Sequence, residues 1–117
     1  LVTSAGIHNK TGIAELTLSE WNRVMAVNVT GTFLFVQHVL KTMIPACKGR
    51  IVTVGSDTGK RGGGRGGKAA YGDSKGAILA FTRATGTIAC CGGRASLSPS
   101  SRRTMVLICC TQTLSGP

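Results

Sequence analysis

Apolar and polar positions fall along this chain in blocks that predict two strands. Residues 1–3 form a short apolar start that runs into the small residues 4–6, a pattern typical of the end of a buried strand. Residues 49–56 form a continuous β-branched run that ends in a turn residue. Such a run predicts a central strand of a parallel sheet, because a strand that is buried on both faces does not alternate.

Two helices are predicted after these strands. The first begins at a capping box, in which the Thr17 hydroxyl accepts the N–H of Glu20 and the Glu20 carboxylate reaches back to the N–H of Thr17. Apolar residues at helical spacing then continue until Pro45 ends the helix. Residues 71 to about 83 show helical spacing again. The order strand, helix, strand, helix predicts an α/β fold with a parallel sheet.

The last quarter of the chain has a different character. Cysteine, serine, arginine, glycine and threonine dominate after about residue 85, and no acidic residue follows Asp73. Residues 104–110 are apolar but follow neither a helical nor an alternating pattern. A chain of 117 residues has room for one domain. We therefore expect residues 1–85 to form that domain and residues 86–117 to be a tail, disordered or encoded in a shifted reading frame.

The sequence also bounds location. No run of about 18 apolar residues occurs, so we expect no membrane-spanning segment. The start has no initiator methionine and no basic region of the kind that begins a signal peptide. We expect a cytoplasmic protein whose chain begins here in mid-sequence.

A formal net charge of +10 raises the alternative of a nucleic-acid-binding fragment. Much of this charge reflects a shortage of acids, since only four are present. Residues 59–68 resemble an arginine-glycine tract of the kind that binds phosphates, and we expect residues 59–67 to form a loop. The tract is short and has no interleaved aromatic residue, which disfavours nucleic-acid binding.

Neither cysteine nor histidine suggests a metal site. The cysteines at 90–91 and 109–110 are adjacent pairs without the two-residue spacer of zinc ribbons, and Cys47 stands alone. His8 and His38 are interpreted as loop and helix-surface residues, and neither is assigned any chemistry.

The candidate chemistry centres on Tyr71 and Lys75. Four residues apart on a helix, they share one face. An ammonium near a phenol favours the phenolate, and such a phenol can exchange a proton with an alcohol or carbonyl oxygen. Ser56 ends the second strand, where strand ends of α/β sheets face the ligand crevice. Asn28 lies inside the first helix, where an amide suggests a local break.

These residues resemble the motifs of the short-chain dehydrogenase/reductase family, from residue 1 to about 85. Residues 1–7 are similar to the family's Asn-Asn-Ala-Gly strand end, and residues 18–31 resemble its long helix with the catalytic asparagine. Residues 49–56 match its serine-bearing strand, and Tyr71-x-x-x-Lys75 matches its signature pair. The resemblance implies a Rossmann-like, doubly wound parallel sheet that is incomplete here, without its first strands and its C-terminal part.

The resemblance also implies a reaction and roles for residues. The reaction is hydride transfer between NAD or NADP and a small alcohol or carbonyl substrate. Tyr71 is implied to be the general acid/base and Ser56 to orient the substrate oxygen. Lys75 assists Tyr71 and binds the nicotinamide ribose, and Asn28 supports a water that relays protons to Lys75. Cofactor contacts are implied for residues 5 and 6 (Ala5 and Gly6) and for Asn28, Tyr71 and Lys75. The full-length protein is implied to be a homo-oligomer.

Three departures from the family pattern stand out. Thr3 and Ser4 replace asparagines, and the loop before Tyr71 is about two residues longer. The family's glycine-rich turn for the cofactor pyrophosphate precedes any residue of this chain, and its Pro-Gly motif is missing after the second helix. We therefore expect the 117 residues alone to be inactive, and an inert truncated relic is a third alternative.

Overall fold

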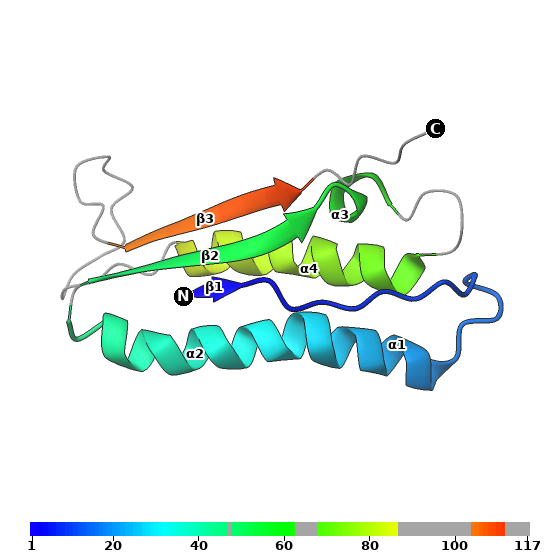
Figure 1. Ribbon diagram of the computed structural model, residues 1–117, viewed down its shortest axis with the longest axis horizontal. Helices are drawn as coiled ribbons and strands as arrows, with labels where there is room; N and C mark the ends of the chain where they lie inside the picture. Colours follow the sequence, from blue (N-terminus) through cyan, green and yellow to red (C-terminus); the bar gives the residue numbers. More distant parts are fainter. Residues whose placement is uncertain (47, 63–67, 87–103, 112–117) are drawn as a thin grey trace.

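The computed structural model describes residues 1–46, 48–62 and 68–86, together with the backbone of residues 104–111. Its elements in chain order are β1 (Val2–Thr3), α1 (Leu18–Met25), the π-helical turn η1 (Ala26–Thr30), α2 (Gly31–Met43), β2 (Gly49–Ser56), α3 (Thr58–Arg61), α4 (Ala69–Gly86) and β3 (Thr104–Thr111). Figure 1 shows the strands lying side by side along the helices.

The described strands form one parallel sheet in the order β1-β2-β3. Val2 and Thr3 of β1 pair with Val52 and Thr53 of β2. On the other edge β3 pairs with β2 along its whole length, from Gly49↔Thr104 to Ser56↔Thr111. The predicted strand over residues 49–56 is confirmed, and it is the central strand of the three. Because the strands are parallel, their carboxyl ends meet at one edge of the sheet.

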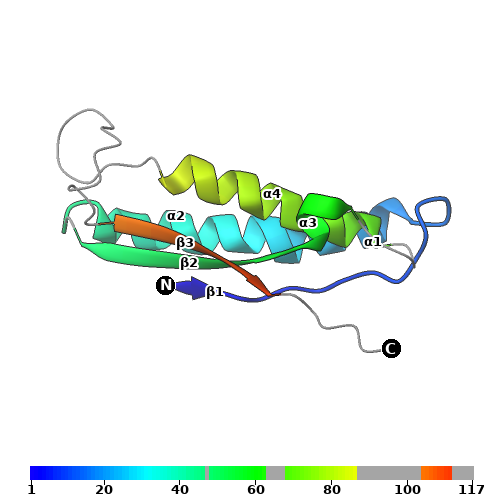
Figure 2. The same ribbon diagram turned by 90° about the horizontal axis from the view of Figure 1, so that it is seen from above.

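The helices pack on one side of this sheet. Figure 2 shows α2 and α4 both on the same side of β2. The apolar core between these layers consists of side chains at most 6% exposed: Val24, Val36, Ile51, Ala70, Ile78 and Leu79. Polar residues are buried beside this core as well, among them Asn28, Ser74 and Lys75. The fold class, an incomplete Rossmann-like parallel α/β sheet, is confirmed.

The first helix begins where the capping signal predicts, but only half of the capping box forms. Glu20 N–H donates to the Thr17 hydroxyl at 3.2 Å. The Glu20 carboxylate does not reach the N–H of Thr17; it accepts a hydrogen bond from the Thr11 hydroxyl, 2.9 Å from each oxygen. The partner of the Glu20 carboxylate therefore comes from the loop before the helix. The sequence of residues 17–20 alone does not indicate this partner.

Two further expectations are corrected, and part of the second stays untested. Val2 is 66% exposed, because β1 lies at an edge of the described sheet and is not covered. Residues 59–61 are not loop but belong to α3, where the N–H groups of Lys60 and Arg61 donate to the Asp57 carbonyl. Residues 63–67 of the expected loop lie outside the described residues.

Residues 104–111 form the full-length neighbour of β2, where the sequence pattern indicates neither a helix nor a strand. Residues 104–110 have no alternating apolar pattern, but a strand can pair through its backbone without one. Residues 87–103 and 112–117 lie outside the described residues, as do Cys47 and the cysteines at 90–91. The reading-frame hypothesis for residues 86–117 stays a prediction.

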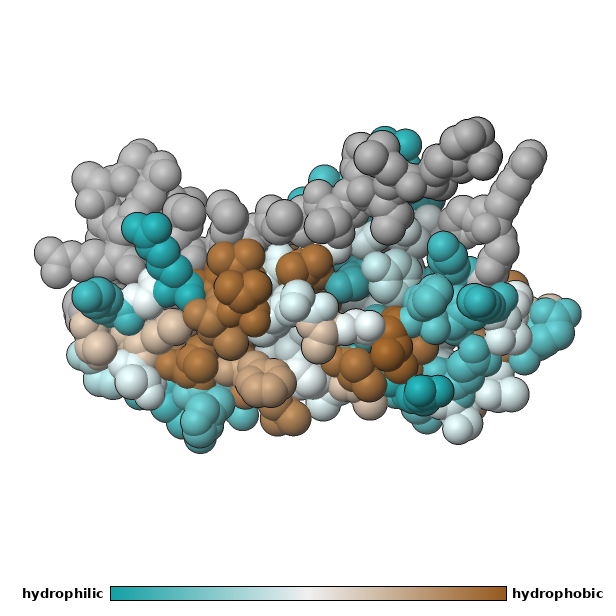
Figure 3. Space-filling view, viewed as in Figure 1, coloured by the Kyte–Doolittle hydropathy of each residue, from teal (hydrophilic) through white to brown (hydrophobic). Residues whose placement is uncertain are grey.

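A long apolar helix stands out on the surface. By length and composition alone, the continuous stretch Leu18–Met43 is apolar enough to cross a membrane, contrary to the expectation that no segment is. The stretch qualifies on its mean hydropathy, although polar residues interrupt its apolar run. Core helices of soluble proteins can reach the same mean hydropathy and length. Figure 3 shows apolar side chains in separate patches across the middle of this face, with hydrophilic side chains between and below them. Leu34 and Phe35 are 53% and 63% exposed.

Candidate active site

Tyr71 and Lys75 meet on one face of α4, as their spacing predicts. The Lys75 ammonium nitrogen lies 5.8 Å from the centre of the Tyr71 ring. Tyr71 is half-buried in the first part of α4, and Lys75 is only 5% exposed. The ammonium lies over the ring of the half-buried phenol, an arrangement in which the two side chains attract each other electrostatically.

Lys75 is held in place from the central strand. Its Nζ donates to the Val54 carbonyl of β2 at 2.8 Å. Burial lowers the pKa of the Lys75 ammonium, because the charged form loses hydration. In the part of the chain that the structure describes, the one ion pair is between Asp57 and Arg61, so no described carboxylate neutralises this ammonium. Lys75 is thus a buried cation with N–H donors to spare.

Asn28 ties three parts of the fold together. Its Oδ1 accepts the N–H of Ile7 at 2.8 Å, and its Nδ2 donates to the Ile7 carbonyl at 2.8 Å. The same Nδ2 donates to the Ser74 hydroxyl at 2.9 Å. The N–H of Ile7 fixes which end of the amide is oxygen, so the orientation of Asn28 follows from its partners. The amide joins the segment after β1 to α4.

The local break expected at Asn28 is a π-helical turn. The π-helical turn covers the five residues Ala26–Thr30, and the N–H of Gly31 donates to the carbonyl of Ala26. A π turn inserts one residue and rotates the side chains around it, and such turns recur at functional sites. Here the turn carries Asn28, which is 1% exposed, into the interior. Sequence reasoning located the irregularity but not its form.

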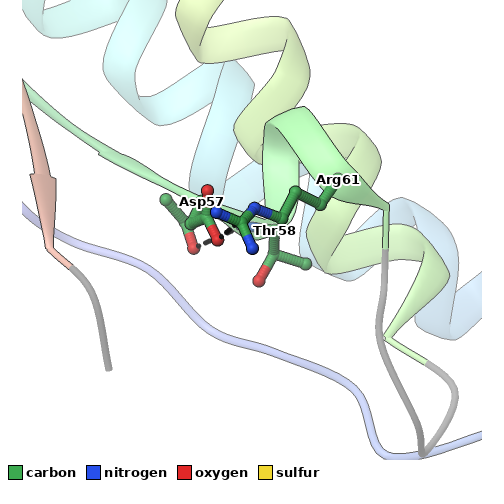
Figure 4. Close-up of polar contacts among 4 residues, drawn as sticks. Asp57, Thr58 and Arg61 are labelled. Atoms are coloured by element: carbon green, nitrogen blue, oxygen red, sulfur yellow. Dashed lines mark hydrogen bonds and ion pairs between the residues drawn. The ribbon is translucent and has the colours of Figure 1, made fainter. Parts of the chain in front are cut away.

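Ser56 ends β2 at the carboxyl edge of the sheet. It lies two residues after Val54, whose carbonyl holds Lys75, and it is 7% exposed. Its hydroxyl accepts the N–H of Thr58 at 3.3 Å, so the serine also begins the turn into α3. Figure 4 shows this turn, with the Asp57 carboxylate and the Arg61 side chain paired at 3.0 Å beside Thr58.

Two glycines lie beside the residues of the predicted site, and one of them allows a close approach between helices. A Cβ added to Gly6 would lie 3.5 Å from Asn28 Oδ1 and 3.7 Å from Lys75 Nζ, in ordinary van der Waals contact with both groups. A Cβ on Gly59 lies 2.6 Å from the backbone nitrogen of Gly76 and 2.6 Å from the carbonyl carbon of Lys75. Only glycine lets α3 pack this closely against α4 beside Lys75.

The structure therefore brings Gly6, Asn28, Tyr71 and Lys75 into one cluster. Ala5 precedes Gly6 in the exposed segment after β1. Ser56 stands at the adjoining strand end, but its hydroxyl has its contact with Thr58 and not with Tyr71 among the described hydrogen bonds. The functional roles of these residues stay predictions.

Sequence reasoning missed two neighbours of this cluster. Ser74 is fully buried and links Asn28 to the carbonyl of Tyr71, to which its hydroxyl donates at 2.8 Å. Its position in the sequence between Tyr71 and Lys75 could have indicated that Ser74 lies near the site. His8, to which the sequence analysis gave no chemistry, lies with its ring centre 6.3 Å from that of Tyr71. No local pattern indicates that contact, because the two residues are far apart in sequence.

Comparisons with known proteins agree on one family. The sequence profile of the family described as "short chain dehydrogenase" matches residues 1–87, close to the limit of about 85 expected from the motifs. The nucleic-acid alternative finds no support in these comparisons.

Individual relatives match the same part of the chain. The 2-(S)-hydroxypropyl-CoM dehydrogenase 3 of Xanthobacter autotrophicus is 43% identical over 83 residues, which are 71% of this chain and 32% of the relative. The 3-oxoacyl-(acyl-carrier-protein) reductase FabG of Aquifex aeolicus is 37% identical over 83 residues, 71% of this chain and 33% of that protein. The chain thus spans about a third of the length of the curated relatives it matches.

A solved structure shows the same arrangement. The structure described as ElxO with NADP bound superposes with a TM-score of 0.67 at 29% identity, covering 73% of this chain and 34% of that one.

Proposed function

Because the chain belongs to the short-chain dehydrogenase family, we propose that it is the catalytic middle of an NAD- or NADP-dependent oxidoreductase. The reaction interconverts an alcohol and a carbonyl compound. One observation carries the proposal: the buried Lys75 ammonium, held by the Val54 carbonyl and without a described carboxylate partner, lies 5.8 Å from the Tyr71 ring. A buried cation costs free energy, so its retention beside a phenol favours a catalytic purpose.

Each residue of the cluster has a proposed part. Tyr71 donates a proton to the carbonyl oxygen during reduction and removes it from the alcohol during oxidation. Lys75 stabilises the phenolate that this transfer leaves. Ser56 orients the substrate oxygen from the end of β2. Asn28 supports the proton relay to Lys75 chiefly by fixing the segment after β1 against α4, since its amide is occupied by Ile7 and Ser74.

The residues present fit a nicotinamide cofactor. Gly6 leaves an open face beside Asn28 and Lys75, where a side chain is absent. Lys75 has N–H donors beyond its bond to Val54, and ribose hydroxyls are acceptors for such donors. Residues 5 and 6 with Asn28, Tyr71 and Lys75 are proposed to hold the nicotinamide side of NAD or NADP. When bound, the cofactor supplies or takes the hydride.

The substrate is proposed to be a small alcohol or carbonyl compound. The two relatives are named as a dehydrogenase of a hydroxypropyl group and a reductase of an oxoacyl group. A hydroxyl and a ketone at the reacting carbon are the two sides of one hydride transfer, which fits a single acid/base at Tyr71.

We further propose that the full-length protein is a cytoplasmic homo-oligomer. The exposed Leu34 and Phe35 side chains of α2 support association, because large apolar patches on a protein surface mark interaction sites. The 117-residue chain by itself is proposed to be inactive and to bind neither NAD nor NADP, because its cluster offers contacts for the nicotinamide side only.

The test compares the full-length protein with its Tyr71→Phe and Lys75→Met variants. Removing the acid/base is expected to lower kcat by about 10²–10⁴-fold, the range for general acid–base catalysis. The assay follows NADH and NADPH absorbance with a panel of ketones and secondary alcohols. Calorimetry with the 117-residue chain is expected to show no heat of cofactor binding. Unchanged turnover in Tyr71→Phe contradicts the proposed chemistry, and measurable binding by the short chain contradicts its proposed inactivity.

A further inference from the structure

His8 lies against the side chain on which the proposed chemistry depends. Its imidazole and the Tyr71 ring have centres 6.3 Å apart and planes inclined by 74°, an edge-on arrangement. Aromatic pairs at this separation and inclination attract each other, because the positive edge of one ring meets the negative face of the other. The Tyr71 ring therefore has two neighbours from different elements, His8 after β1 and Lys75 on α4.

The residues on both sides of His8 are hydrogen-bonded, the first through its backbone and the second through its side chain. The N–H and the carbonyl of Ile7 both bond to the Asn28 amide at 2.8 Å. Asn9, on the other side, is 3% exposed and donates from Nδ2 to the Thr11 carbonyl at 3.0 Å. His8 itself is exposed, but it projects from a segment that its two neighbours fix. Its ring therefore contacts Tyr71 from a segment whose position is fixed by its neighbours.

The orientation of the Tyr71 side chain depends on packing of this kind. Its backbone is fixed by the Ser74 hydroxyl, which donates to its carbonyl at 2.8 Å. Among the described hydrogen bonds none involves the phenol oxygen, so packing decides where the hydroxyl points. An acid/base works only when its proton faces the reacting oxygen, and a displacement of about 1 Å can cost a hundredfold in rate.

We propose that His8 is a positioning residue for Tyr71. Its imidazole holds the phenol ring at the angle that directs the hydroxyl to the substrate, while Lys75 stabilises the phenolate. This inference rests on the proposed function for the role of Tyr71, but the ring contact itself is independent of it. The contact belongs to the segment after β1, where His8 follows Ile7, two residues after Gly6.

The composition of the chain allows a direct spectroscopic test. Tyr71 is its single tyrosine, so the near-ultraviolet circular dichroism that disappears in Tyr71→Phe belongs to this side chain. The variants are His8→Ala, which removes the ring, and His8→Phe, which keeps an aromatic edge. His38→Ala is the matched control, because His38 is the only other histidine and is exposed on α2. All spectra are taken on the 117-residue chain at equal folded fraction, determined by far-ultraviolet circular dichroism.

His8→Ala is expected to lose about half or more of the Tyr71 band, since a ring without its edge contact samples several orientations. His8→Phe and His38→Ala are expected to keep it. In the full-length enzyme, His8→Ala is expected to lower kcat about tenfold with KM changed by less than about twofold, and His8→Phe to restore kcat. A full Tyr71 band in His8→Ala overturns the contact. An altered band with unchanged kcat overturns the positioning role.

The two hypotheses fail in distinguishable ways. If Tyr71→Phe retains activity, the proposed function fails while the ring contact stands or falls on the spectra alone. If Tyr71→Phe is inactive and His8→Ala is fully active, the proposed function stands and the inference about His8 is wrong.

Discussion

The two strands that flank β2 differ in how far they pair and in the contacts made by the segments beyond them. β3 pairs with β2 at every position from Gly49↔Thr104 to Ser56↔Thr111, whereas β1 pairs at only two positions. Yet the family match covers β1 and ends at residue 87, before β3. The segment after β1 carries Gly6, Ile7 and His8, which contact the residues of the proposed site.

The two sides of β2 are held by different interactions, backbone pairing on the β3 side and specific side-chain contacts on the β1 side. The pairing of β3 with one edge of β2 depends only weakly on side-chain identity, because every residue except proline offers the same backbone N–H and C=O groups. The β1 side depends on particular side chains: the Asn28 amide bonds both backbone groups of Ile7, and glycine at position 6 leaves room beside Lys75. We expect β3 to determine whether the sheet is stable, and the segment after β1 to determine whether a site exists.

The largest expected effect comes from removing β3. A chain that ends at Gly86 leaves β2 unpaired along eight residues on one edge. At about 0.5 kcal/mol for each ladder hydrogen bond, the loss is about 4 kcal/mol, comparable to the stability of many domains. We expect urea denaturation to show no cooperative transition for this chain. A chain that lacks only residues 112–117 is the control, and an unchanged transition after the Gly86 truncation would show that β3 adds no stability.

A smaller effect is expected on the β1 side. Asn28→Ala removes the partners of the N–H and carbonyl of Ile7 and of the Ser74 hydroxyl. We expect a loss of about 3 kcal/mol in the free energy of unfolding, since buried polar groups are left unsatisfied. Asn22→Ala, an exposed amide on α1, is the matched control and should change stability by less than about 0.5 kcal/mol. Equal effects from the two variants would mean that the Asn28 contacts contribute nothing beyond helix propensity.

Sequence reasoning succeeded where the signal was local. The β-branched run over residues 49–56 has the bounds of β2, and the spacing of Tyr71 and Lys75 places them on one face of α4. The poor fit of an amide to a helix marked Asn28, where the π turn lies. Each of these signals is a property of a few consecutive residues, which a pattern can carry.

Contacts between distant residues escaped it. The bond from Asn28 to Ser74 joins residues 46 positions apart, and no periodicity within either helix indicates it. The same holds for the edge contact of His8 with Tyr71. The strand at residues 104–111 was missed for a different reason: its position beside β2 depends on pairing, and its sequence has no alternating pattern.

The smallest expected effect concerns Lys75, which packs against the central strand between the two sides. Burial lowers its pKa below the ordinary value of 10.5, so between the lowered pKa and 10.5 the unfolded chain holds a proton on Lys75 that the folded chain releases. Stability rises with pH wherever the unfolded state binds more protons. The cost of the buried ammonium is therefore complete below the lowered pKa and disappears as pH rises through this window.

Lys75→Met should accordingly be more stable than the parent chain at pH 7, by about 1 kcal/mol, because an apolar side chain of similar length avoids the desolvation cost. The advantage should shrink as pH approaches 10.5. Urea denaturation from neutral pH up to that value measures the difference, with Lys41→Met, an exposed lysine on α2, as the control that should show no such trend. A Lys75→Met chain that is less stable at neutral pH would mean that the hydrogen bond to Val54 outweighs desolvation. The expected gain, together with loss of turnover in the full-length variant, would show that this lysine is retained against stability for the chemistry of Tyr71.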